Sequence, residues 1–117
     1  MNHKLVTVAD RFEYEGKLHY NCQTTRVHTA TDFEGGKVTM GVTHFLPNGY
    51  ADVRPAAYEM IYTCLLGKIA IQIVDGDVNT EYVLDAGDSI RMMPGVQRGC
   101  RVIGPDYCDL QVVIING

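Results

Sequence analysis

One histidine, two tyrosines and two arginines are the side chains best suited to chemistry in this sequence. His44 has an unperturbed pKa near neutrality, so it can take up or release a proton at physiological pH. Tyr62 or Tyr58 could assist as a proton donor or stabilise an anion. Arg54 and Arg98 could hold a carboxylate or phosphate, because guanidinium recognises both groups through paired hydrogen bonds. These residues predict proton-transfer chemistry on a small anionic molecule.

Two other hypotheses use neighbouring side chains. In the first, the protein binds or senses a small molecule without converting it, in an apolar pocket lined by Tyr62 and by methionines: Met40, Met60 and Met92 or Met93. In the second, the protein is a metalloenzyme. A histidine with carboxylates would suit iron, manganese or zinc, and the ligands would come from His44, Asp52, Glu59 and Cys64 or Cys108. This second hypothesis requires a strand register in which Glu59 faces inward.

The elements that must position these residues are strands. Period-two alternation and β-branched runs predict strands over 21–29, 38–46, 59–66, 68–74, 81–84, 89–93, 99–103 and 108–115, with a weaker one over 5–9. Gly and Pro clusters mark the turns between them, at Pro47-Asn48-Gly49, Gly67, Asp75-Gly76 and Pro94-Gly95. Short strands at this spacing predict an all-β sandwich or barrel.

Strand parity predicts which side chains face inward, since successive side chains point to opposite faces. If Met60 points into the barrel, Tyr62 and Cys64 do so as well. If Arg98 points inward, Cys100 and Val102 follow. His44 shares a face with Met40, Val42 and Leu46, and this apolar face is expected to be the inner one, which would place His44 near Tyr62. The remaining histidines, His3, His19 and His28, are expected at the surface. His28 alternates with Arg26 and Thr24, and this polar strand face is expected to be exposed.

Residues 38–115 resemble the cupin superfamily in the order and spacing of three segments. These are Leu46-Pro47-Asn48-Gly49, the glycine-closed strand from Tyr58 to Lys68, and the stretch from Leu84 to Arg98, with Ala86-Gly87-Asp88 followed by Pro94-Gly95-Val96. The resemblance implies a double-stranded β-helix, that is, a jelly-roll barrel. It implies a single domain over 1–117, with a cupin core over 38–115 and an N-terminal arm or edge strand over 1–20.

The chain departs from the cupin pattern at the metal-binding positions. Counted back from Gly67, to within one residue, the two histidine positions fall on Arg54 and Ala56, and the carboxylate position falls on Met60. The later histidine position falls on Arg98. Arginine stays protonated and only donates hydrogen bonds, so no metal cofactor is expected. Some small sugar-modifying and cyclising cupins work without a metal, so the resemblance permits a metal-independent isomerase, epimerase, dehydratase or lyase.

Composition limits the partners and the compartment. The 117 residues carry a net charge of −4 and no run of basic residues, which argues against nucleic acid. No apolar run reaches the length of about eighteen residues that a membrane span needs. The N-terminus lacks the apolar stretch of a secretory signal, so a cytoplasmic protein is expected. A homodimer is also expected, because cupins commonly pair through an edge strand.

Overall fold

The computed structural model describes residues 2–116, which form nine strands and two short 3-10 turns. The turns lie at Val8–Asp10 and Ala30–Asp32. None of the helical segments among these residues has the length and apolar character needed to cross a membrane. The strands are β1 Phe12–Tyr14, β2 His19–His28, β3 Val38–Pro55, β4 Glu59–Leu66, β5 Lys68–Asp75, β6 Val78–Asp85, β7 Ser89–Met92, β8 Gln97–Val102 and β9 Cys108–Ile115.

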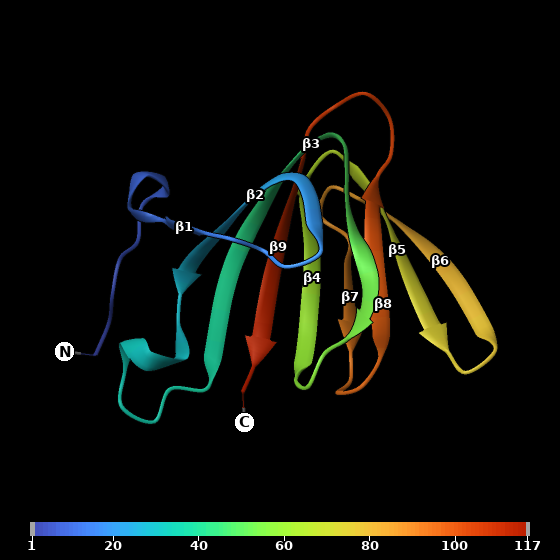
Figure 1. Ribbon diagram of the computed structural model, residues 1–117. Helices are drawn as coiled ribbons and strands as arrows, with labels where there is room; N and C mark the ends of the chain where they lie inside the picture. The colour runs from blue at the N-terminus through green and yellow to red at the C-terminus, as the bar shows by residue number, and fades with distance from the viewer. Residues whose placement is uncertain (1, 117) are drawn as a thin grey trace.

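The strands curl into a barrel, and the long strand β3 joins its two sides (Figure 1). The antiparallel order is β6-β5-β8-β3-β9-β4-β7, with β2 also paired to β3 and β1 paired to β2. The first half of β3 pairs with β9, from Val38 to Phe45, and its second half pairs with β8, from Tyr50 to Pro55. Because one strand serves both sides, residues near its end lie beside residues of β8 at the mouth of the barrel. The all-β class and the barrel are confirmed.

Two predictions at the N-terminal half of the chain are wrong. The expected turn at Pro47-Asn48-Gly49 lies inside β3, which runs for 18 residues. Asn48 takes a left-handed backbone conformation there (φ 67°), and Gly49 lies close to the Asn21 carbonyl, so the strand bends and does not end. The weak strand expected over 5–9 is absent, and the segment contains the 3-10 turn at Val8–Asp10.

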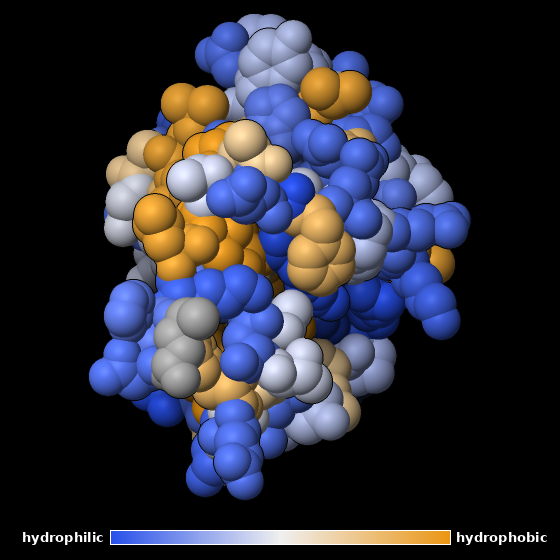
Figure 2. Space-filling view, turned by 90° about the vertical axis from the view of Figure 1, so that its left-hand side faces the viewer, coloured by the Kyte–Doolittle hydropathy of each residue, from blue (hydrophilic) through white to orange (hydrophobic). Residues whose placement is uncertain are grey.

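The N-terminal segment, residues 2–14, is joined to the barrel by polar contacts. Lys4 forms an ion pair with Asp32, and the Thr24 hydroxyl donates a hydrogen bond to the Tyr14 carbonyl. Its apolar side chains remain exposed at Leu5, Val8 and Phe12. Figure 2 views this side of the molecule and shows apolar side chains gathered there among hydrophilic ones. The segment therefore contributes little to the apolar core.

The core fills the interior between the two sides of the barrel. Inward alternation on β4 buries Met60, Tyr62 and Cys64, as predicted. On β8 it buries Arg98 and Cys100, together with Val102, again as predicted. The other members of the core cluster are Phe45, Ile69, Ile71, Leu84, Met92, Cys108 and Leu110.

Phe45 is fully buried at the centre of this cluster, which gives a stability prediction. Replacing Phe45 with Ala should lower the free energy of unfolding by about 3–5 kcal/mol, because the change removes apolar burial and leaves a cavity. The exposed Leu66 provides a matched control, since Leu66→Ala should cost less than about 0.5 kcal/mol. Urea denaturation of both variants measures the difference. Equal losses would show that Phe45 does not belong to the core.

Candidate functional site

Two arginines face each other directly at the mouth of the barrel. Arg54 of β3 and Arg98 of β8 are partners in the antiparallel register, so their side chains lie on the same face. Arg98 is 8% exposed. It donates hydrogen bonds to the Tyr62 hydroxyl (3.2 Å), the Arg54 carbonyl (2.5 Å) and the Met60 sulfur (3.3 Å). Among residues 2–116, no carboxylate forms an ion pair with either arginine.

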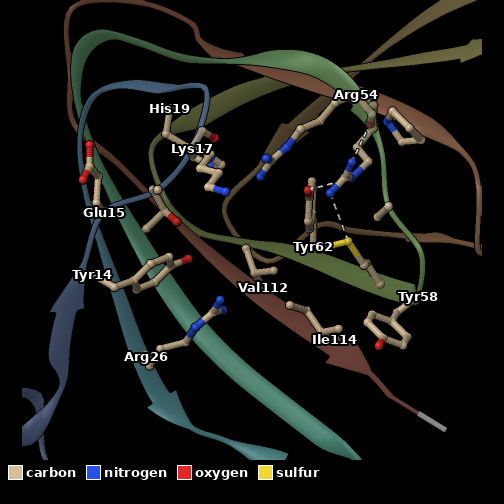
Figure 3. Close-up of a pocket in the computed structure, with 16 residues that line it drawn as sticks. Tyr14, Glu15, Lys17, His19, Arg26, Arg54, Tyr58, Tyr62, Val112 and Ile114 are labelled. Atoms are coloured by element: carbon tan, nitrogen blue, oxygen red, sulfur yellow. Dashed lines mark hydrogen bonds between the residues drawn. The ribbon is translucent and has the colours of Figure 1, made fainter.

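A cavity of about 420 Å³ opens in front of this pair (Figure 3). Its cationic side chains are Lys17, Arg26, Arg54 and Arg98, and Glu15 is the single carboxylate among the described residues that line it. The protein carries a net charge of −4, so this excess of positive charge is local. The rest of the lining is mainly apolar and aromatic: Tyr14, Thr43, Ala56, Tyr58, Met60, Tyr62, Val112 and Ile114. The site is thus suited to an anion with an apolar part.

The loop before β2 brings a histidine into the cavity. Lys17 and His19 both line it, and they flank Leu18 in the sequence. Leu18 has a left-handed backbone conformation (φ 57°) and belongs to the turn that precedes β2. A Leu rarely adopts this conformation. The Leu18 carbonyl accepts a hydrogen bond from the Asp52 amide (2.9 Å), which fixes the turn against β3.

His19 is held in one orientation over the core. Its Nδ1 lies 2.7 Å from the Lys17 carbonyl oxygen, so in the neutral ring Nδ1 carries the proton and Nε2 is the free acceptor. Its ring stacks on Phe45, with centroids 6.5 Å apart. Burial lowers the pKa of His19 below 6.5, and the positive charges of Arg54 and Arg98 lower it further. His19 is therefore a neutral base near pH 7.

Tyr62 contributes a protonated hydroxyl to the same cavity. Burial raises its pKa above 10, and this effect outweighs the opposing influence of Arg98. Its oxygen accepts the Arg98 hydrogen bond, which leaves its own proton for donation. Neutral His19 and protonated Tyr62 form an acid and base pair beside the two arginines.

The predicted positions of His44 and Met40 inside the barrel are wrong. Thr43 and Phe45 face inward on β3, so His44 lies on the outer face with Met40. The His44 Nδ1 contacts Asp109 (2.5 Å), and its ring stacks on Tyr107. The Met40 sulfur accepts a hydrogen bond from Gln111. The apolar character of this outer face has a structural reason: Val42 is buried there, and Val8 and Ala9 of the N-terminal segment line the same hollow.

The other predicted substrate-binding residues do converge. Arg54, Arg98, Tyr58, Met60 and Tyr62 all line the cavity. Tyr58 lies at its rim and is about half exposed. The four positions that the sequence comparison aligned with cupin metal ligands, Arg54, Ala56, Met60 and Arg98, thus line the same cavity.

These residues do not fit a metal ion. Arg54 and Arg98 repel a cation, and the Met60 thioether already accepts a hydrogen bond from Arg98. No group of three or more potential ligands among His, Cys, Asp and Glu occurs within residues 2–116.

The alternative ligand set is also dispersed. Glu59 pairs with Arg91, Asp52 accepts a hydrogen bond from Tyr20 (3.1 Å), and His44 contacts Asp109. Cys64 lies in the core, where burial raises its pKa and keeps it protonated. The prediction that these four residues could meet at one metal is therefore wrong.

One side of the cavity comes from the N-terminal half of the chain and was not predicted from the sequence. Its residues fall in the expected N-terminal arm or on the strand face expected to be exposed: Tyr14, Glu15, Lys17, His19 and Arg26. The alternation of Thr24 with Arg26 along β2 could have indicated that these two side chains share an inward face. Thr24 is 3% exposed, so this polar face of β2 points into the barrel.

Comparison with known proteins supports the fold. No family model and no curated protein sequence matches the chain. Among solved structures, the Drosophila melanogaster CENP-C cupin domain superposes with a TM-score of 0.78 at 12% identity, over 97% of this chain and 82% of that one. An RmlC-like cupin from Shewanella frigidimarina gives a TM-score of 0.76 at 14% identity, over 99% of this chain and 93% of that one. An oxalate oxidase gives 0.72 at 17% identity, over 82% and 51%. The chain therefore has the jelly-roll fold of the cupin superfamily.

Proposed function

We propose that this protein binds a small carboxylate or phosphate in the barrel mouth and catalyses proton transfer on it without a metal. The observation that carries the proposal is the direct pairing of Arg54 with Arg98 and the lack of a carboxylate partner for either among the described residues. Like charges directly opposite each other destabilise a sheet, and a buried charge is costly until it is paired. An anionic ligand would relieve both costs.

The arginines would hold and orient the anion. Arg98 is fixed by three hydrogen bonds to protein atoms, so its guanidinium presents its remaining N–H groups in a defined direction. Within residues 2–116 the Arg54 guanidinium forms no ion pair, and it can turn toward the ligand (Figure 3). Carboxylate and phosphate oxygens accept paired hydrogen bonds from such groups. Lys17, from the turn before β2, would add a third positive charge.

Proton transfer would follow from the protonation states of His19 and Tyr62. The free Nε2 of neutral His19 would abstract a proton from the bound anion, and the Tyr62 hydroxyl would donate one at another atom. Holding the acidic group against Arg54 and Arg98 would favour loss of a proton from the adjacent carbon, because positive charge stabilises the resulting anion. This is chemistry of the isomerase, epimerase, dehydratase or lyase type. In this proposal His19 replaces His44 as the base.

A cupin that binds such an anion without converting it is the second candidate. The apolar wall of Met60, Val112 and Ile114 favours this hypothesis, because it suits a ligand held mainly by burial. The two candidates share the arginines and differ in the role of His19.

If Arg54 belongs to an anion site, replacing it should raise the stability of the ligand-free protein and weaken anion binding. Arg54→Met should raise the stability of the ligand-free protein by about 0.2–1 kcal/mol, because it removes a like-charge pair. It should also abolish most of the increase in melting temperature that phosphate or sulfate gives the wild type. Thermal unfolding with and without each salt measures both effects. Arg101→Met is the control, since Arg101 pairs with Glu81 outside the cavity. Equal stabilisation of wild type and Arg54→Met by phosphate would contradict the proposal.

Catalysis can be tested before the substrate is known. Small carboxylates that bind are incubated with the protein in D2O, and NMR follows the exchange of their carbon-bound hydrogens. Exchange above the uncatalysed rate is expected for the wild type and should fall by about 100-fold or more in His19→Ala. His44→Ala should exchange at the wild-type rate, because His44 lies on the outer face. Binding with no exchange in the wild type would favour the non-catalytic candidate.

The lowered pKa of His19 also predicts a dependence of stability on pH. Between this pKa and the unfolded value of 6.5, the unfolded chain binds a proton that the folded protein does not. The free energy of unfolding should therefore fall as the pH drops through 6.5. His19→Gln should lose this component. Denaturant titrations of both proteins across this range provide the measurement, and identical pH profiles would show that His19 is not buried in the folded mouth.

A further inference from the structure

A third arginine lies at the other end of the cavity, away from Arg54 and Arg98. Arg26 is on the inward face of β2, two residues after buried Thr24. Figure 3 shows its guanidinium beside Tyr14, with Val112 between it and the Arg54 end of the cavity. The two cationic ends are therefore separated along the length of the site.

The position of Arg26 is set by its neighbours. Its guanidinium carbon lies 4.2 Å from the centre of the Tyr14 ring, a cation–π geometry that holds it in place. Its register partner on β3 is Gly41, which has no side chain to occupy the space beside it. A Cβ at Gly41 would lie 2.4 Å from the Thr25 carbonyl oxygen and 3.8 Å from an Arg26 terminal nitrogen. The close backbone approach therefore requires glycine at this position, and the Arg26 guanidinium has no side chain of its register partner beside it.

No carboxylate among residues 2–116 forms an ion pair with Arg26. Glu15, which also lines the cavity, belongs to the loop after β1, and Figure 3 shows its carboxylate turned away from Arg26. The surface between the two cationic ends is apolar, from Val112 and Ile114 of β9 and Met60 of β4. The cavity therefore presents positive, apolar and positive regions in sequence.

We propose that the ligand is an elongated dianion with an acidic group at each end and an apolar body between them. One group binds Arg54 and Arg98, and the second binds Arg26. The apolar body lies on Val112 and Ile114. This inference rests on the proposed anion site and extends it, because it names the class of molecule that the site selects. A monoanion of the same length would leave Arg26 without a partner.

Titration calorimetry with matched aliphatic acids tests the inference. The series runs from succinate to suberate, and each dicarboxylate is compared with the monocarboxylate of equal carbon number. At one chain length the dicarboxylate should bind about tenfold to a hundredfold tighter, the gain expected from one further hydrogen-bonded charge. In Arg26→Met this preference should disappear while monocarboxylate binding remains. In Arg54→Met both acids should bind weakly.

Arg91→Met is the matched control, because Arg91 pairs with Glu59 away from the cavity and should not alter either affinity. If Arg26→Met does not fold, Arg26→Gln serves the same purpose, with folding checked by circular dichroism. Monocarboxylates and dicarboxylates that bind the wild type equally would overturn the dianion inference and leave the anion site intact. A wild type that binds neither acid would overturn the anion site itself.

Discussion

The mouth of the barrel is organised around a positive charge that the fold itself leaves unbalanced. Arg98 is buried, and its hydrogen bonds go to a hydroxyl, a carbonyl and a thioether, none of which carries a negative charge. Arg54 stands opposite it because β3 crosses from one side of the barrel to the other. The barrel cannot close at this point without bringing the two arginines together. Pairing them with an external anion is the simplest way to offset that cost.

Half of the site followed from the sequence because reliable turns anchor its strands. Gly67 ends β4 and Pro94-Gly95 precedes β8, which fixes the positions of both strands in the sequence. Side-chain alternation along these strands then correctly predicts that Met60, Tyr62 and Arg98 face inward. The same method failed for His44. The face of β3 that carries Val42 is apolar and buried, although it lies outside the barrel. Hydrophobic alternation reports which face is covered, and it does not report what covers it.

The other half of the site comes from a segment whose turn the sequence pattern does not predict. Lys17 and His19 flank Leu18, which adopts a left-handed conformation that is rare for a bulky residue. Strained residues of this kind tend to occur where function constrains the chain. Arg26 was misplaced for a different reason, since a polar strand face was assumed to be exposed. In this protein a polar face points into the interior because the interior contains the site.

The strand β1 forms one wall of the cavity, and this wall can open locally without unfolding the rest of the barrel. Three residue pairs join β1 to β2, and β2 is its only partner among the described strands. Short edge elements open locally at a lower free energy than the global unfolding of a domain. Tyr14 can thus move away with β1 while the arginines of β3 and β8 stay in place. Such an opening removes the aromatic ring from Arg26, so the placement of this guanidinium depends on the pairing of a strand of only three residues.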